Sequence, residues 1–195
     1  MLTEAELPNA VFLDTETTGL GHNDQIVEIA IIDHHGRALL ETLVRPTVPI
    51  GEEAQAVHGI TAADLVAAPT FPDILPRIVA AVLDRHVVIY NRDFDTRLLA
   101  QTLAAHDLLT GEGTLRQRLD GVFAPRAWHC AMLTYAEFWG DWNSRCHGYT
   151  WQSLAKAVSQ QGCRLPDGLR AHRARADAEL TRQLVLKMIA QTRCS

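Results

Sequence analysis

Two carboxylates, Asp14 and Glu16, stand two positions apart where an apolar run at residues 10–14 ends. Side chains two positions apart on a β-strand point to the same face, so we expect both carboxylates to project into one crevice. Two acids held this close repel each other unless a cation lies between them, and hard oxygen ligands suit Mg²⁺ or Mn²⁺. Because such pairs are also common on solvated strand ends, this pair indicates a metal site only if further ligands join it.

A further acid follows a second compact apolar run, at residues 86–90. The residues from Asp93 onward have the apolar spacing of a helix, so Asp93 and Asp95 both fall in its first turns. The helix dipole explains an acid at this end, and we assign that role to Asp93. Asp95 is then the carboxylate expected to face the crevice, and Phe94 should turn toward the core or a ligand.

The third group of chemically active residues is His172 and Asp177, at the entry to the last helical segment. Residues five positions apart on a helix differ by about 140°, so these side chains would point apart if both were helical. We therefore expect His172 in the loop before the helix. From there its imidazole could approach a water held by the metals that Asp177 helps to bind, although a histidine at a helix entry is more often an ordinary surface residue.

These groups match, in order and spacing, the motifs of a known enzyme family. FLDTETTGL at residues 12–20, YNRDFD at 90–95 and HRARAD at 172–177 resemble the three motifs of the DEDD exonuclease superfamily. The H-x-A-x-x-D form of the third motif indicates the DEDDh branch, which includes the proofreading exonuclease subunits of bacterial DNA polymerase III. The similarity extends over residues 11–184, and VHGIT at 57–61 also resembles a family segment near the bound terminal nucleotide.

The resemblance implies a role for each matching residue. Two divalent metal ions, Mg²⁺ or Mn²⁺, would be held by Asp14, Glu16, Asp95 and Asp177, and His172 would be the general base. The side chains expected to contact the last nucleotide are Thr15, Thr17, Thr18, Leu20, His58, Asn91 and Phe94. Relatives often carry an apolar residue where Arg175 stands, which bears on local substrate contacts and leaves metal binding untouched.

The implied activity is a 3'–5' exonuclease that hydrolyses phosphodiester bonds from the 3' end of DNA, single-stranded or frayed. Two metal ions would lower the pKa of the attacking water and stabilise the leaving oxygen, and the products would be 5' nucleoside monophosphates. Such an enzyme would serve DNA replication or DNA repair. The alternative substrate is RNA, as in an RNA 3'-end trimming or oligoribonucleotide-degrading enzyme. It stays open because the sequence does not reveal whether a side chain contacts the 2' hydroxyl, which distinguishes RNA from DNA.

Two other functions fit parts of the sequence. FLDTET superficially suggests a phosphatase with a strand-end aspartate nucleophile, but the second acid is Glu16 and no lysine lies where that chemistry needs one. The other is a polymerase-bound accessory proofreading module. The chain ends soon after the last helical segment, so we expect a free enzyme, while a DNA polymerase partner and the oligomeric state stay open.

A mixed α/β fold must position these residues. Strands are predicted at residues 10–14, 25–33, 37–44, 86–90 and 128–130, the first three forming a meander. Helices are predicted at residues 62–68 with Thr61 as N-cap, at 71–83, from 93 onward, and at 130–139, 150–161 and 176–191. Residues 108–127 are left unassigned. The resemblance implies a ribonuclease H-like exonuclease fold, with a five-stranded mixed sheet flanked by helices on both faces.

Composition agrees with one soluble domain. The 195 residues, 47% of them hydrophobic, suffice for one core, so we expect residues 1–195 to form a single exonuclease domain. The net charge of -5 argues against a protein that coats nucleic acid through a broad basic face, but an enzyme that holds only the last nucleotides needs few phosphate contacts. No membrane span or signal segment is visible, so we expect a cytoplasmic protein.

Three further groups leave alternatives open. Cys130, Cys146, Cys163 and Cys194 match no familiar zinc-site spacing and are interpreted as ordinary thiols. Arginines around the third motif either guide the scissile strand or form a solvated helix entry; they are Arg164, Arg170, Arg173 and Arg175. Tryptophans at positions 139, 142 and 151 either stack on bases or pack in a core, and the spacing favours a core.

Overall fold

The computed structural model describes residues 2–109, 111–145 and 147–193. At its centre lies a five-stranded sheet with strand order β3-β2-β1-β4-β5. The strands are β1 (Ala10–Thr17), β2 (Ile26–Asp33), β3 (Ala38–Leu43), β4 (His86–Ile89) and β5 (Ala127–Cys130). β1 and β3 run antiparallel to β2, whereas β4 is parallel to both β1 and β5. The predicted mixed sheet and its N-terminal meander are confirmed.

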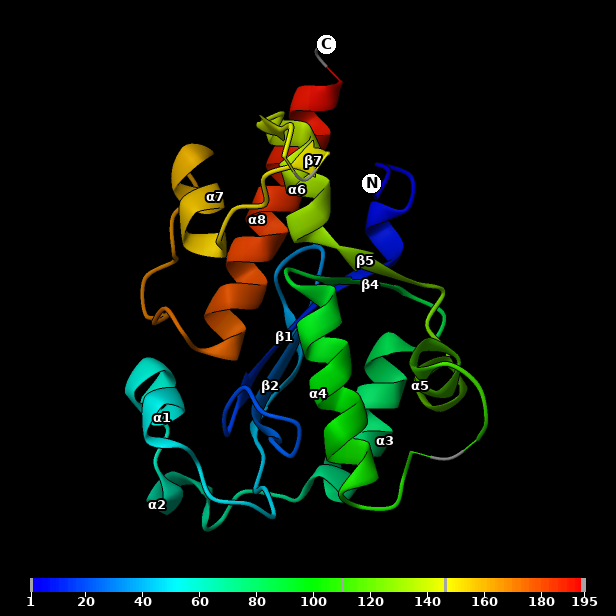
Figure 1. The fold of residues 1–195 in the computed structure, drawn as a ribbon, viewed down its shortest axis with the longest axis vertical. Helices are drawn as coiled ribbons and strands as arrows, with labels where there is room; N and C mark the ends of the chain where they lie inside the picture. The colour runs from blue at the N-terminus through cyan, green and yellow to red at the C-terminus, as the bar shows by residue number, and fades with distance from the viewer. Residues whose placement is uncertain (1, 110, 146, 194–195) are drawn as a thin grey trace.

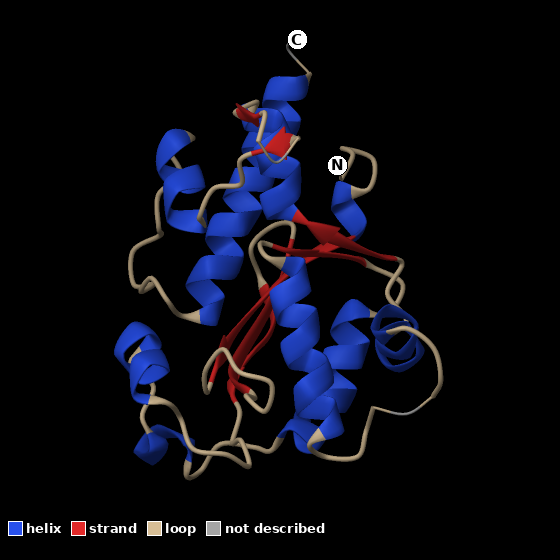
Figure 2. Ribbon diagram, in the orientation of Figure 1, coloured by secondary structure: helices blue, strands red, loops and turns tan. Residues whose placement is uncertain are grey.

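Helices cover both faces of the sheet, as predicted (Figure 1). One face packs against α3 (Phe71–Val82), α4 (Arg92–Ala104) and α5 (Leu115–Phe123). The other packs against α6 (Ala131–Trp139), α7 (Leu154–Gln160) and α8 (Ala174–Thr192). The shorter elements, visible in Figure 2, are η1 (Leu7–Asn9), α1 (Glu52–His58), α2 (Ala62–Leu65) and the hairpin of β6 (Trp142–Asn143) and β7 (Gly148–Tyr149).

The alternation of side chains along β1 decides which layer each residue enters. Val11 and Leu13 pack in the core with α3 and α4, whereas Ala10 and Phe12 pack in the core with α8. Each fully buried large apolar side chain contributes about 1.5–3 kcal/mol, which holds the strand in this register. Since successive strand residues point to opposite faces, the even-numbered residues beyond Phe12 also face the layer that contains α8.

Some helix bounds differ from the predictions, and local capping explains the start of α7. α7 begins at Leu154 rather than at residue 150, since the Ser153 side chain accepts a hydrogen bond from the Lys156 backbone at 3.3 Å. α8 begins at Ala174, earlier than predicted. The unassigned segment contains α5, whose first turn is stabilised by a capping box between Thr114 and Gln117.

α1 is a helix that the sequence did not predict. It begins after Gly51 and ends at Gly59, which adopts a left-handed conformation with φ 74°. Its apolar residues are too few to give a helical stripe, so its existence depends on the surrounding chain. Thr61, by contrast, is the predicted N-cap of α2 and forms a capping box with Asp64.

The prediction that the three tryptophans pack in a core is wrong. Trp139, Trp142 and Trp151 are 44%, 56% and 63% exposed. Trp142 and Tyr149 instead meet edge to face across the β6–β7 hairpin, which lies in a stretch expected to be a loop.

Cys130 and Cys163 are free thiols, as expected, while the interpretation of Cys146 and Cys194 concerns positions outside the described residues. Within the described ranges, no helix combines the length and apolar character that a membrane span requires.

Candidate active site

Asp14 and Glu16 both lie inside β1, which continues beyond the predicted strand to Thr17. They occupy the strand face that is turned toward the α8 layer. β2 pairs with this part of β1 so that Glu16 lies opposite Glu28, and the register shifts between Glu16 and Thr17. The irregularity ends the regular strand directly after Glu16, so the two acids are the last alternating side chains on this face.

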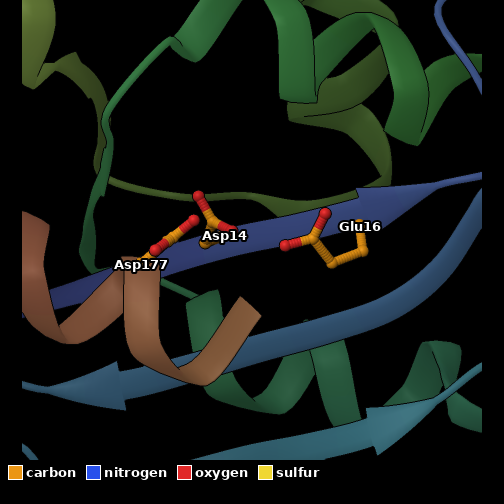
Figure 3. A group of neighbouring side chains, drawn as sticks. All are labelled: Asp14, Glu16 and Asp177. Atoms are coloured by element: carbon orange, nitrogen blue, oxygen red, sulfur yellow. The ribbon is translucent and has the colours of Figure 1, made fainter. Parts of the chain in front are cut away.

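Asp177 joins these two acids from the first turn of α8. In Figure 3 its side chain lies beside Asp14, and Glu16 follows farther along β1. Each of the three residues offers a carboxylate oxygen, and these oxygens lie within 4.8 Å of one another. The fold thus brings together two strand residues and one helix residue from opposite ends of the sequence. Three half-buried carboxylates supply the hard oxygen ligands that Mg²⁺ and Mn²⁺ prefer.

Asp95 approaches from the first turn of α4 and is buried. Its Oδ1 accepts a hydrogen bond of 2.8 Å from the Thr15 hydroxyl. Asp95 is not one of the three clustered carboxylates, yet its repulsion adds to the effect of burial in raising the pKa of Asp14. Asp93 is exposed and forms an ion pair with Arg92. The structure therefore directs Asp95, and not Asp93, toward the cluster.

Burial disfavours ionisation of all four carboxylates, and repulsion from neighbouring acids adds to it at Asp14, Glu16 and Asp177. Burial, followed by repulsion from Asp95 and Asp177, raises the pKa of Asp14 well above its usual range. Burial, followed by repulsion from Asp177, raises the pKa of Glu16 to about 8. Burial also raises the pKa of Asp95, to about 7, and that of Asp177. A divalent cation would relieve this repulsion, so the donor set fits a metal site.

His172 lies in the loop before α8, as predicted, and its side chain is exposed. Its φ is 57°, a left-handed conformation that a non-glycine residue rarely adopts. Burial raises the pKa of Asp177, and the His172 ring charge and backbone N–H both oppose this rise. His172 is therefore beside Asp177, with its imidazole open to solvent.

A cleft of about 730 Å³ opens at the Glu16 end of the cluster. Its walls are the turn after β1 and the helix α1, with Leu20 among the lining residues. Five of the residues predicted for the metal or substrate site line it: Glu16, Thr17, Thr18, Leu20 and His58. The cleft thus gathers most of the predicted contacts to the last nucleotide.

His58 closes one end of this cleft and is buried. Its Nδ1 accepts a hydrogen bond of 2.9 Å from the Ile60 backbone, so Nε2 carries the proton and faces the Thr17 carbonyl at 3.2 Å. Burial lowers the pKa of His58, which keeps this ring neutral. His58 therefore joins α1 to the turn after β1 and fixes the cleft wall.

The other predicted substrate contacts lie outside the cleft. The Thr15 hydroxyl binds Asp95, and Asn91 is the exposed N-cap of α4. Phe94 is half-buried, with the Arg97 guanidinium 5.2 Å from its ring centroid. Their contacts with a nucleotide stay predictions.

Comparison with known proteins identifies the family. Residues 11–185 match the model of the exonuclease family RNase_T. The chain belongs to this exonuclease family. Over 173 residues the exonuclease is 42% identical to the uncharacterized exonuclease CP81 of Escherichia phage 186, covering 88% of the chain and 83% of the relative. It is 28% identical over 181 residues to exodeoxyribonuclease 10 of Escherichia coli K12, covering 91% and 67%.

The fold of this exonuclease is also that of solved exonucleases. It superposes on exonuclease X in complex with 5' overhanging duplex DNA with a TM-score of 0.65 and 26% identity, over 94% of the chain and 92% of the other. The predicted ribonuclease H-like fold and membership of the DEDD superfamily are confirmed. The protein is a hydrolase of the 3'–5' exonuclease type that acts on nucleic acid.

An ion pair that the sequence did not predict anchors α8 of the exonuclease to β2. Arg173 Nη2 lies 2.5 Å from the buried Glu28, and the Ala174 backbone donates to the same carboxylate at 2.9 Å. Glu28 is a lone acid within an otherwise apolar stretch of β2, and that isolation was the only signal available in the sequence. Because Glu28 lies opposite Glu16, this pair positions the start of α8 over the acidic cluster.

Two of the four arginines around the third motif make structural contacts in this exonuclease. Arg173 binds Glu28, and Arg175 donates to the Gly36 carbonyl at 2.7 Å and lies 3.6 Å from Glu41. Arg175 therefore ties α8 to the β2–β3 turn. Guidance of the scissile strand stays a prediction for Arg164 and Arg170.

Proposed function

We propose that this exonuclease removes nucleotides one at a time from the 3' end of DNA and releases 5' nucleoside monophosphates. The observation that carries the proposal is the cluster of Asp14, Glu16 and Asp177 at the mouth of a cleft of about 730 Å³. Small-ligand pockets range from roughly 300 to 1,000 Å³, so the cleft can accept a nucleotide. A strand with its terminal nucleotide in the cleft would have its last phosphodiester beside the carboxylates.

We assign the binding of two divalent ions, Mg²⁺ or Mn²⁺, to Asp14, Glu16, Asp95 and Asp177. The raised pKa of Glu16, about 8, reflects burial and repulsion that a cation would offset. When bound, the two ions lower the pKa of the attacking water and stabilise the leaving 3' oxygen. Thr15 donates to one oxygen of Asp95 and thereby orients this carboxylate.

His172 is the proposed general base. Its exposed ring beside Asp177 can accept the proton from the attacking water at Nδ1 or Nε2 and pass it to solvent. The left-handed backbone at His172 turns the chain directly before α8 begins. The imidazole thereby stays outside the helix, free to move toward the reacting phosphate.

The wall residues of the cleft would hold and separate the last bases. Leu20 is 76% exposed and lines the cleft, which suits a wedge between the final two bases. Thr17 and Thr18 are buried in the same wall and hold its turn. The Thr18 hydroxyl donates to Asp24 at 2.6 Å.

Two of the more similar relatives support DNA rather than RNA as the substrate. The exodeoxyribonuclease 10 relative is named for a deoxyribonucleic acid substrate, and the solved exonuclease X holds duplex DNA. We further propose that residues 1–195 fold as a single exonuclease domain, which the match over residues 11–185 supports.

Digestion of 5'-labelled DNA and RNA oligonucleotides with Mg²⁺ or Mn²⁺ tests the proposal. We expect a ladder of products that shorten by one nucleotide from the 3' end, with DNA cleaved faster than RNA. Asp14→Ala and His172→Ala should each abolish the ladder. Unchanged activity in both variants would exclude these residues from the mechanism, and faster cleavage of RNA would exclude DNA as the preferred substrate.

A further inference from the structure

Three exposed aromatic residues lie on the β6–β7 hairpin and directly after it: Trp142, Tyr149 and Trp151. Trp142 lies directly opposite Tyr149 in the antiparallel pairing, and their rings meet edge to face with centroids 5.2 Å apart. Trp151 follows Tyr149 by two positions, and the Thr150 backbone still donates to Asp141 at 2.8 Å. Directly opposed residues, and residues two apart in extended backbone, lie on the same side, so we expect the Trp151 ring on the side of Trp142 and Tyr149, and we call these three residues the aromatic face.

This aromatic face is turned to solvent. Trp142, Tyr149 and Trp151 are 56%, 42% and 63% exposed. Large aromatic rings gathered at the surface in this way mark binding sites, because their burial by a partner is favourable. The catalytic roles assigned above use none of the three.

The aromatic face is joined to the active site through β4. Gln152, next to Trp151, accepts a hydrogen bond of 2.8 Å from the Tyr90 hydroxyl through its carbonyl. β4 is parallel to β1 and pairs Val88 with Phe12, and Tyr90 and Asp14 each follow this last pair by two residues. The Trp151 segment is thus tied to the Asp14 end of the carboxylate cluster.

The cleft for the terminal nucleotide lies at the other end of the cluster, between Glu16 and α1. Figure 1 shows the N-terminal end of α8 between α1 and the segment that joins β7 to α7. A strand with its last nucleotide in the cleft and its last phosphodiester at the carboxylates would leave the cluster at the Asp14 end, the end to which the Trp151 segment is tied through Tyr90.

We propose that Trp142, Tyr149 and Trp151 form a stacking surface for the nucleotides upstream of the scissile bond. The proposal rests on the proposed exonuclease function and names the part of the substrate that this surface binds. Aromatic rings stack on any base, so the surface would hold a single strand without reading its sequence.

Charge favours a nucleic acid strand over a basic protein surface as the occupant. Between residues 139 and 163 the sequence contains one acid, Asp141, whereas the whole chain carries a net charge of -5. Arg145 and Lys156 are exposed in the same segment. Cations in the segment that carries the rings can neutralise backbone phosphates, and proteins combine affinity with tolerance of sequence in this way.

Substrates of different length distinguish binding at this surface from binding at the catalytic site. The p-nitrophenyl ester of thymidine 5'-monophosphate reaches only the cleft and the carboxylates, whereas an oligothymidylate of ten nucleotides also extends over the aromatic face. We expect Trp151→Ala to leave kcat/KM for the ester unchanged and to raise KM for the long oligonucleotide about tenfold with kcat unchanged. Trp151→Phe should keep most of the affinity, because it retains a ring.

Trp139→Ala is the matched control. Trp139 is a 44% exposed tryptophan, but its ring stacks on Tyr135 of its own helix and it is not part of the aromatic face. An unchanged KM for the long oligonucleotide in Trp151→Ala would overturn the proposal, and so would an equal loss in Trp139→Ala. If the wild-type protein cleaved neither the ester nor any oligonucleotide, the proposed function itself would fail.

Discussion

Arg173, the residue before α8, binds Glu28 on β2 through two guanidinium nitrogens, at 2.5 Å for Nη2 and 3.0 Å for Nε. Glu28 lies opposite Glu16, so the pair ties the helix that carries Asp177 to the strand beside the other clustered acids. The carboxylate cluster is therefore positioned by an ion pair between residues far apart in the sequence.

Arg173→Ala should lower both stability and activity. It leaves the buried Glu28 without its partner, and we expect a loss of about 2 kcal/mol, because Arg173 is partly exposed and a fully buried pair would cost more. Adding Glu28→Gln should recover part of this loss, since the unpaired charge is then removed. Chemical denaturation of the single and double variants measures the coupling. If the two substitutions lowered the free energy of unfolding additively, the ion pair between Arg173 and Glu28 would be contradicted.

Asp14→Asn should reduce kcat/KM more than about 100-fold, since even indirect metal-site changes cost 10- to 100-fold. It should also raise the Tm of the metal-free protein, by about 2–4 °C for each kcal/mol of relieved repulsion. Mg²⁺ should stabilise the wild type and have little effect on the variant. Asp93→Asn, at an exposed acid near the site, is the control and should retain wild-type activity and metal response.

His172→Gln should lower kcat roughly 100- to 10,000-fold, which is the contribution of a positioned general base. Stabilisation by Mg²⁺ should persist, because the carboxylates are intact. Thermal unfolding at increasing Mg²⁺ concentration measures the stabilisation, and digestion of labelled DNA measures kcat. His35→Gln changes an exposed histidine in the β2–β3 turn and should have no effect on either. Loss of the Mg²⁺ response in His172→Gln would make His172 a determinant of metal binding.

The metal-free protein should lose stability as the pH rises. Glu16 has its pKa raised from 4.5 to about 8, and the pKa of Asp95 is also raised, so the folded protein binds these protons more tightly than the unfolded chain. The stabilisation is present at low pH and is lost as the pH rises from about 4.5 through about 8. Thermal unfolding in the presence of a chelator across this pH range measures the loss of stability. A Tm that rises toward pH 8 would contradict the assignment.

Leu20→Ala should slow digestion of frayed duplex ends roughly fivefold while changing single-strand digestion little, because a wedge matters only where bases must be separated. Parallel assays on the two substrates measure the ratio. Val66→Ala removes a 71% exposed apolar side chain away from the cleft and should leave the ratio unchanged. If Leu20→Ala slowed digestion of both substrates equally, Leu20 would not act as a wedge.

Local patterns in the sequence determined much of the site. The spacing of Asp14 and Glu16 sets their common face, because strand side chains alternate with a period of two. The angle between His172 and Asp177 on a helix required His172 to precede α8, and it does. The meander, the capped start of α2 and the motifs of the exonuclease family are also legible in neighbouring residues.

Tertiary contacts decided the rest, because they join residues that no local pattern relates. The choice of Asp95 over Asp93 depends on Thr15, 80 positions away, and the start of α8 depends on Glu28. The exposure of Trp151 was predicted wrongly, since its spacing resembles that of a core residue and only the packing of α6 and α8 shows that the core is already filled. Burial, and with it the raised pKa of each carboxylate, exists only once distant segments have excluded water.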